Sequence, residues 1–179
     1  MPTTNDHRAT AAQPTIRIGY GFDSHEFRAG IPLKIGGITL QHDKGLGGHS
    51  DGDVLLHAIT DALLGAIAAP DIGALFPPSD PKWKGTDSMI FLQEALKRVH
   101  DAGYVLANVD ASLILAAPKI GPHAVAIRAR VAELLGVPGD CVGLKAKTPE
   151  GLNLENVAVA HVAVLLEYKR RTQRRKKSN

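Results

Sequence analysis

The order of strand-like and helix-like segments limits the fold of this chain more than any other feature of its sequence. Runs rich in β-branched residues, which predict strands, alternate irregularly with stretches whose apolar residues recur at helical spacing. Such an order favours an α+β fold, in which helices pack on one face of a mixed sheet of roughly four strands, with a small N-terminal hairpin beside it. The predicted strands are 15–22, 104–116, 141–147 and 157–168, the hairpin is 31–40, and the helices are 50–69, 87–100 and 122–135.

The first predicted helix follows a glycine-rich loop. Ser50 is a suitable N-cap, with Asp53 three residues later in the manner of a capping box, and Pro70 ends the helix. The free amide donors and the positive dipole end of a helix start attract anions, and the preceding glycines allow the backbone to approach a phosphate closely. We therefore expect a phosphate group to bind at the Ser50 end of this helix.

Length and composition predict one folded domain with two appendages. The 179 residues are 44% hydrophobic and 22% charged, which is typical of a globular protein. The net charge of +3 comes from the C-terminus, because seven of the 21 basic residues lie in the last eleven positions and only 14 remain against 18 acidic residues. We expect a disordered N-terminal extension at 1–14, a single domain at 15–168 and a basic tail at 169–179.

The same composition argues against several classes of function. An aromatic share of 4% disfavours a surface that stacks nucleic-acid bases, and the basic tail has no interleaved aromatic residues. The single cysteine, Cys141, excludes an internal disulfide and a thiolate metal cage. The N-terminus lacks the apolar run of a signal peptide, and no stretch approaches the ~18 apolar residues of a membrane span. We expect a cytoplasmic protein with neither a membrane nor a specific nucleic acid as its partner.

Histidine and aspartate residues are concentrated between positions 23 and 61. Asp23 and His25 follow the first predicted strand, and side chains two residues apart in extended backbone face the same side. His57 lies on the first predicted helix, on one stripe with Asp61. One carboxylate and two imidazoles with a fourth position open are typical of catalytic zinc. The alternatives are a hydrogen-bonded turn and unliganded helix residues, and the density of these groups favours the metal site.

Three longer stretches carry a resemblance to a known family. GYGFDSHEF at 19–27, GHSDGDVLLHAITDALLGA at 48–66 and DIGALFPPSD at 71–80 resemble the 2-C-methyl-D-erythritol 2,4-cyclodiphosphate synthase family. The similarity continues through 84–88, 117–119 and 145–150, so that it covers about 17–168.

The resemblance implies a lyase-type cyclisation in isoprenoid precursor biosynthesis by the non-mevalonate pathway. The substrate, 4-diphosphocytidyl-2-C-methyl-D-erythritol 2-phosphate, would use its 2-phosphate to attack the β-phosphorus of its own diphosphate. CMP would leave, and 2-C-methyl-D-erythritol 2,4-cyclodiphosphate would form. The alternative is a metal-dependent phosphohydrolase of a nucleotide-linked substrate, in which a metal-bound water attacks instead.

The resemblance also implies two metal sites. Asp23, His25 and His57 would bind Zn²⁺ or another divalent transition metal. Glu150 would be the single protein ligand of a Mg²⁺ or Mn²⁺ ion that bridges the diphosphate. Asp61 would support catalysis by holding the metal ligand His57 in position without binding the metal itself. The alternative is that Asp61 is a carboxylate on the helix surface.

The remaining implied roles concern the substrate. His49 and Thr148 would act in catalysis by placing the phosphates for in-line attack, while Asp71 and Gly73 would hold sugar hydroxyls. The loop at 116–120 would form the cytosine pocket. The full substrate-binding set is His49, Ser50, Asp71, Gly73, Ala116, Ala117, Pro118, Lys119, Ile120, Lys147, Thr148 and Glu150.

The family forms homotrimers with active sites between subunits, so the resemblance implies a homotrimer whose interior is lined by the apolar strand 157–166. The chain departs from the family pattern at three places. Segment 152–156 lacks an arginine that the family associates with an anion, often an isoprenoid diphosphate, on the trimer axis, and we expect weak or absent axial binding here. Pro78 stands where an acidic residue is common, and Lys147 replaces a frequent threonine, although its charge suits a diphosphate.

Overall fold

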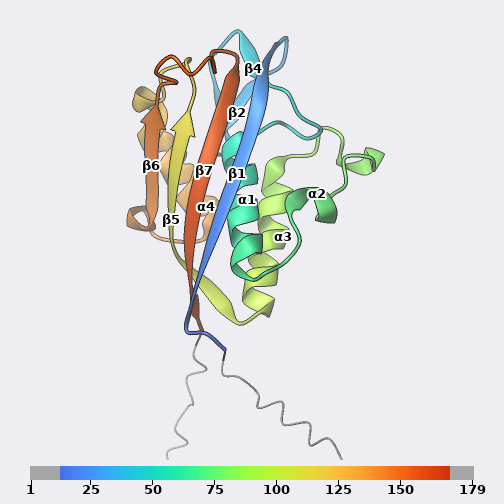
Figure 1. The fold of residues 1–179 in the computed structure, drawn as a ribbon, viewed down its shortest axis with the longest axis vertical. Helices are drawn as coiled ribbons and strands as arrows, with labels where there is room; N and C mark the ends of the chain where they lie inside the picture. The colour runs from blue at the N-terminus through green and yellow to red at the C-terminus, as the bar shows by residue number, and fades with distance from the viewer. Residues whose placement is uncertain (1–12, 170–179) are drawn as a thin grey trace, which may run out of the picture.

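A five-stranded mixed sheet carries the helices of residues 13–169, the part of the chain that this computed structural model describes (Figure 1). The strand order is β4-β1-β7-β5-β6, in which β5 and β6 are parallel and the other neighbours are antiparallel. The main elements are β1 (Ile16–Ala29), β4 (Lys44–Leu46), α1 (Val54–Ala66), α3 (Ser88–Asp101), β5 (Tyr104–Ile114), α4 (Ala124–Leu135), β6 (Val142–Lys147) and β7 (Val157–Tyr168). The predicted α+β class is confirmed, whereas the predicted number of four strands is wrong.

Smaller elements complete the chain between these strands and helices. The predicted hairpin is present as β2 (Leu33–Ile35) and β3 (Ile38–Leu40), which pair only with each other. The loop expected after the first helix contains a short helix, α2 (Ile72–Leu75). Turns of 3₁₀ helix lie at Pro81–Trp83, Gly121–His123 and Gly139–Cys141.

Strand β1 is longer than its sequence pattern predicts, and this corrects the expected position of two site residues. It pairs with β7 along almost its whole length, from Ile16 opposite Glu167 to Glu26 opposite Val157. Asp23 and His25 therefore lie within the strand rather than in a loop after it. The expected alternation holds, since both side chains face the side on which α1 packs.

The N-cap of α1 lies three residues later than predicted, so Ser50 does not cap the helix. The N-cap is Asp53, whose fully buried carboxylate accepts hydrogen bonds from the amides of Leu56 (3.0 Å), Gly36 (2.9 Å) and Gly37 (2.7 Å). One side chain thus caps the helix and ties it to the β2–β3 turn. The predicted N-cap is accordingly wrong, whereas the phosphate contact expected at Ser50 stays a prediction.

Replacing Asp53 with alanine should lower the free energy of unfolding by about 3 kcal/mol, because three amide donors lose their acceptor. Urea denaturation measures this change. Asp80→Ala is the matched control, since Asp80 caps only an exposed 3₁₀ turn by accepting from Lys82. Equal stabilities for the two variants would contradict the role assigned to Asp53.

Two glycines of β1 allow α1 to lie directly against the strand. A Cβ atom at Gly19 would stand 1.8 Å from the carbonyl oxygen of Ala62, and one at Gly21 would stand 1.9 Å from that of Ala58. Side chains of any size would push the helix away from the sheet. The close contact brings His57 of α1 opposite the following segment of β1.

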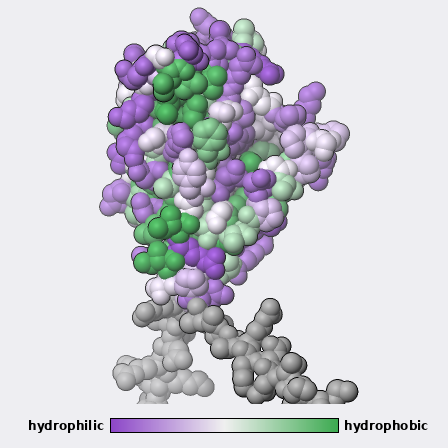
Figure 2. Space-filling view, viewed as in Figure 1, coloured by the Kyte–Doolittle hydropathy of each residue, from purple (hydrophilic) through white to green (hydrophobic). Residues whose placement is uncertain are grey.

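On the opposite face of the sheet, strand β1 is apolar and exposed. Alternate residues of β1 point to this side: Ile16, Ile18, Tyr20 and Phe22, of which Ile18 is 73% exposed. Figure 2, viewed from the same side as Figure 1, shows hydrophobic side chains gathered over parts of the surface in front of the helices. An uncovered face of this kind is typical of an interaction surface.

The two predicted appendages fall mostly outside residues 13–169. Of the expected N-terminal extension, Gln13 and Pro14 are described, and the hydroxyl of Tyr104 donates to the carbonyl oxygen of Pro14 at 2.9 Å. The basic tail beyond residue 169 lies outside the described part of the chain. Within that part, no helix has the length and apolar character needed to cross a membrane.

Candidate metal centre and active site

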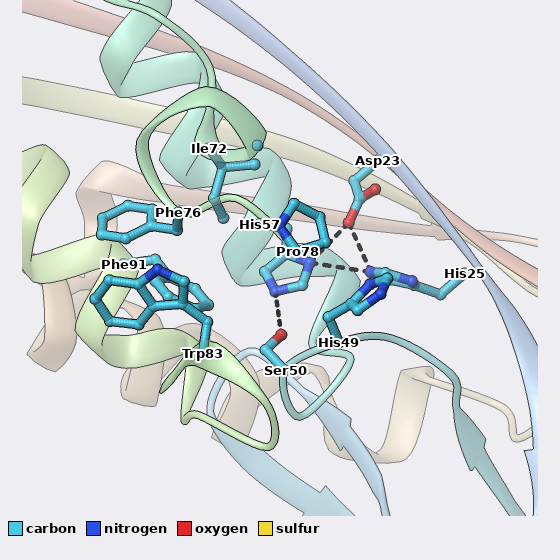
Figure 3. A pocket seen from close by; sticks show the side chains of 11 residues that line it. Asp23, His25, His49, Ser50, His57, Ile72, Phe76, Pro78, Trp83 and Phe91 are labelled. Carbon is cyan, nitrogen blue, oxygen red and sulfur yellow. Dashed lines mark hydrogen bonds and ion pairs between the residues drawn. The ribbon is translucent and has the colours of Figure 1, made fainter. Parts of the chain in front are cut away.

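Three predicted ligands meet at one point between β1 and α1 (Figure 3). The Nε2 atom of His25, the Nδ1 atom of His57 and the Oδ2 atom of Asp23 lie 2.9 Å from one another in all three pairings. The strand supplies two of these atoms, and the helix that packs on its glycines supplies the third. The geometric part of the sequence prediction is confirmed, because one ligand atom of each residue belongs to this cluster.

The arrangement fits a divalent transition metal. In a tetrahedral zinc site with bonds of about 2.0–2.1 Å, neighbouring ligand atoms lie about 3.3 Å apart, so the three atoms would need to separate by only about 0.4 Å. One carboxylate and two imidazoles are also the donor types that such a metal prefers. The open side of the triangle faces a pocket, which leaves space for a substrate oxygen as a further ligand.

The electrostatic surroundings keep Asp23 ionised. Burial disfavours its charged form, but the hydrogen bonds and charges of His25 and His57 outweigh burial and hold the pKa of the Asp23 carboxyl well below its usual range. A carboxylate must be deprotonated to bind a metal. Asp23 is therefore ready to act as a ligand at any physiological pH.

The pocket beside the triad of Asp23, His25 and His57 has an aromatic wall. Phe76, Trp83 and Phe91 pack against one another, with ring centroids 4.6–5.8 Å apart. Of the predicted substrate residues, His49, Ser50 and Gly73 line this pocket, as does Pro78. The pocket thus combines a polar corner that would hold a metal with a wall suited to apolar parts of a ligand.

Two predicted residues of this region have other partners. Asp61 does not hydrogen-bond to His57; its Oδ1 atom accepts from the amide of Ile72 at 2.8 Å and so fixes the start of α2. Burial, together with the nearby carboxylates of Asp71 and Asp23, raises the pKa of Asp61. Asp71 is exposed and caps α2 by accepting from Ala74 at 2.8 Å. The idea that Asp61 holds His57 directly is therefore wrong.

The remaining predicted residues gather at a second pocket near the end of β6. Its lining includes Pro118, Lys119, Ile120, Lys147, Thr148 and Glu150, and the Thr148 hydroxyl donates to the Glu150 carboxylate. Ala116 and Ala117 do not line it, and Ala117 faces a separate hollow with His42. No residue lines both this pocket and the pocket at Asp23. One chain therefore presents two separate groups of predicted site residues.

Comparison with known proteins assigns the family. Residues 16–167 match the model of the YgbB family. The chain belongs to this family. A relative from Koribacter versatilis, named 2-C-methyl-D-erythritol 2,4-cyclodiphosphate synthase, is 68% identical over 152 residues, which cover 85% of this chain and 98% of the relative. A chloroplastic protein of the same name from Oryza sativa subsp. japonica is 52% identical, over 88% of this chain and 75% of its own.

Solved structures of YgbB-type proteins share the fold. A structure described as 2C-methyl-D-erythritol-2,4-cyclodiphosphate synthase in its bound form with CDP has a TM-score of 0.80 and 44% identity, over 84% of this chain and 100% of that chain. A Plasmodium falciparum protein in a CDP complex has a TM-score of 0.77 and 30% identity, over 88% of this chain and 99% of its own.

Three residues on the side of His57 away from the three ligand atoms were not predicted from the sequence to belong to the site. The Nε2 atom of His57, on the far side of the ring from the cluster, lies 2.8 Å from the hydroxyl of Ser88. Ser88 donates to Asp51, and Asp51 also accepts from Lys34 at 2.9 Å. Asp51 belongs to the aspartate-rich stretch and Ser88 begins a predicted helix, but no local pattern links them to His57.

Proposed function

We propose that this chain converts 4-diphosphocytidyl-2-C-methyl-D-erythritol 2-phosphate into 2-C-methyl-D-erythritol 2,4-cyclodiphosphate and CMP, a step in isoprenoid precursor biosynthesis. The name of its 68% identical relative and the CDP-bound structural neighbour support this reaction. The observation that carries the proposal is the triangle of Asp23, His25 and His57 ligand atoms at the base of a pocket. We expect the reaction to take place in the cytoplasm.

Two groups of residues would each hold one metal ion at the reacting phosphates. Asp23, His25 and His57 would hold Zn²⁺ or another divalent transition metal, and Glu150 would hold Mg²⁺ or Mn²⁺. Such ions polarise phosphoryl oxygens and offset the repulsion between two anionic phosphates. His49 and Ser50 lie beside the first site, while Lys147 and Thr148 lie beside the second.

These residues would orient the substrate for in-line displacement. An oxygen of the 2-phosphate forms a bond to the β-phosphorus, and the bond from that phosphorus to the oxygen bridging to the α-phosphorus breaks. The bridging oxygen keeps the electron pair and leaves as part of CMP. Because the second pKa of a phosphate monoester is about 6, the attacking group is already ionised at neutral pH and needs no general base. Positioning and charge neutralisation are then the whole task of the protein.

Removing the metal tests this proposal. Treatment with a strong chelator followed by gel filtration should lower CMP release to about 1% or less of its original rate, because phosphate repulsion is no longer screened. Chromatography of the products measures CMP. Adding Zn²⁺ and Mg²⁺ together should restore the rate, whereas Mg²⁺ alone should not. Full activity in the stripped protein would contradict a metal-dependent cyclase.

The complete active site would form between neighbouring subunits of a homotrimer. The metal triad belongs to β1 and α1, whereas Glu150 follows β6, and β7 and β5 separate β1 from β6 in the sheet. At about 4.8 Å per strand, this order places the two groups well over 10 Å apart across one sheet. A second copy would bring its own β6 end to the triad, with the exposed apolar face of β1 as part of the interface.

Replacing Ile18 with glutamate should convert the trimer to monomers, because a charge would enter the apolar face of β1. Activity should fall by about a hundred-fold or more, since displacement of site residues by even 1 Å has effects of this size. Analytical ultracentrifugation measures the assembly. Val125→Glu is the control, because Val125 is 78% exposed but lies on α4 rather than on the open face of the sheet. A trimeric, active Ile18→Glu variant would contradict this interface.

A further inference from the structure

We propose that Ser88 is a positioning residue for the metal ligand His57, and that Asp51 and Lys34 hold Ser88 in this role. This inference rests on the metal site proposed above. The observations are a continuous line of contacts: His57 Nε2 to Ser88 Oγ at 2.8 Å, Ser88 Oγ to the Asp51 carboxylate, and that carboxylate to Lys34 Nζ at 2.9 Å.

The chemistry of these groups sets the direction of each hydrogen bond. An ionised carboxylate only accepts, so Ser88 must donate its single hydroxyl proton to Asp51. The oxygen of Ser88 then accepts from His57, which places the ring proton on Nε2. With the proton on Nε2, Nδ1 is the ring nitrogen whose lone pair would bind a metal, and it lies 2.9 Å from both Asp23 and His25. The line of contacts therefore selects the tautomer that binds a metal.

Lys34 stabilises the charged form of the Asp51 carboxylate. Burial opposes ionisation of Asp51, but the hydrogen bonds from Ser88 and Lys34 outweigh it and lower the pKa of Asp51. Lys34 also lies 3.5 Å from Asp87, the N-cap of α3. An acceptor that stays ionised at neutral pH cannot return a proton to Ser88, which maintains the direction described above.

The fold brings the four residues together from separate segments. Lys34 belongs to β2, Asp51 to the loop before α1, His57 to α1 and Ser88 to the first position of α3. Ser88 is fully buried and His57 is 8% exposed. Backbone hydrogen bonds join the loop at Asp51 to the segment before Ser88, with the Asp51 amide donating to the Thr86 carbonyl at 3.1 Å. The hydroxyl of Ser88 is thus held in place by backbone as well as by side chains.

Ser50 competes for the same ring proton, and this has a consequence for the substrate. Its hydroxyl lies 3.0 Å from His57 Nε2, slightly farther than that of Ser88, and it lines the pocket. Because one N–H group has one proton to donate, engagement of His57 by Ser88 leaves the Ser50 hydroxyl available to a ligand. Ser88 orients the metal ligand, and Ser50 remains available to contact a phosphate.

Zinc affinity of purified variants tests the inference without measuring turnover. Ser88→Ala and Asp51→Asn should each weaken zinc binding by about ten- to a hundred-fold, the usual effect of removing a partner of a metal-bound histidine. Competition with a chromophoric chelator measures the affinity. The double variant should bind zinc no more weakly than Ser88→Ala, because Asp51 acts only through Ser88. Thr60→Val is the control, since it removes another fully buried hydroxyl, which donates to Leu56 within α1.

A spectroscopic signature separates positioning from a purely structural role. In the zinc-loaded wild type, ¹⁵N NMR of the His57 ring should show a proton on Nε2 that exchanges slowly with water, and Ser88→Ala should make this exchange clearly faster. Should Ser88→Ala fail to fold, Asp51→Asn carries both measurements. Zinc affinity within two-fold of wild type in the folded variants, or an exchange rate of the Nε2 proton that does not change, overturns the inference. Failure of the wild type itself to bind zinc would overturn the proposed metal site as well, which distinguishes the two failures.

Discussion

Replacing Asp23 with asparagine should abolish zinc binding and lower the rate of cyclisation by about a thousand-fold or more, since a metal contributes several kcal/mol to a phosphoryl transition state. Asparagine has nearly the same shape, but it is neutral and a much weaker ligand. The Oδ2 atom of Asp23 lies 2.9 Å from both histidine nitrogens, so it contributes the negative charge of the cluster. Elemental analysis and a CMP-release assay measure the two losses on one sample.

The matched control for this variant is Asp43→Asn. Asp43 is exposed in the loop after β3, outside the metal pocket, and loses the same charge on substitution. It should retain wild-type zinc content and wild-type activity. An Asp23→Asn protein with normal turnover would show that the triad does not hold the catalytic metal.

Gly21→Ala should lower the free energy of unfolding by more than about 3 kcal/mol, as expected when a buried backbone contact is overpacked. The new Cβ atom would stand 1.9 Å from the carbonyl oxygen of Ala58, and the neighbouring backbone of α1 cannot move without leaving the sheet. The same movement would withdraw His57 from Asp23, so zinc binding should fall with stability. Urea denaturation and zinc titration measure the two effects.

Gly139→Ala provides the comparison for this prediction. Gly139 begins a 3₁₀ turn before β6, and a Cβ atom there would meet nothing within 4 Å. The free energy of unfolding of the Gly139→Ala variant should stay within about 0.5 kcal/mol of wild type, as for most surface substitutions. If Gly21→Ala were as stable as Gly139→Ala, the account of α1 resting on glycine backbone would be wrong.

Elements with strong local signals were predictable from the sequence. The bounds of β7 agree at both ends, because its apolar residues form a long run broken only by His161 before Glu167. Helix α3 begins directly after its N-cap Asp87, in agreement with the predicted helix at 87–100. In these segments local propensity and tertiary packing favour the same structure.

Elements that depend on distant partners were not predictable. Strand β4 has three residues within a glycine-rich stretch and exists because it pairs with the end of β1. The start of α1 depends on amides of Gly36 and Gly37, which bind Asp53 from the hairpin. No local pattern contains these contacts, and they override the suitability of Ser50 as a cap.

The candidate site also combines residues that local patterns predicted with residues that only distant contacts bring together. The alternation of an extended strand was enough to place Asp23 and His25 on one side, and helix spacing offered His57 as their partner. The contact from His57 to Ser88 joins residues 31 positions apart and had no local signal. The roles of Lys147, Thr148 and Glu150 came from family resemblance alone, and within one chain these residues lie at a different pocket from the triad.

The central claim is that a phosphate of the substrate, rather than water, attacks the diphosphate. Running the reaction with purified protein, Zn²⁺ and Mg²⁺ in ¹⁸O-labelled water tests this claim directly, because phosphorus-31 NMR resolves both the products and the isotope shift of each phosphorus. We predict CMP and a cyclic diphosphate, neither of which carries ¹⁸O. Linear phosphorylated products with ¹⁸O at phosphorus would mean that water attacks and would identify the protein as a phosphohydrolase.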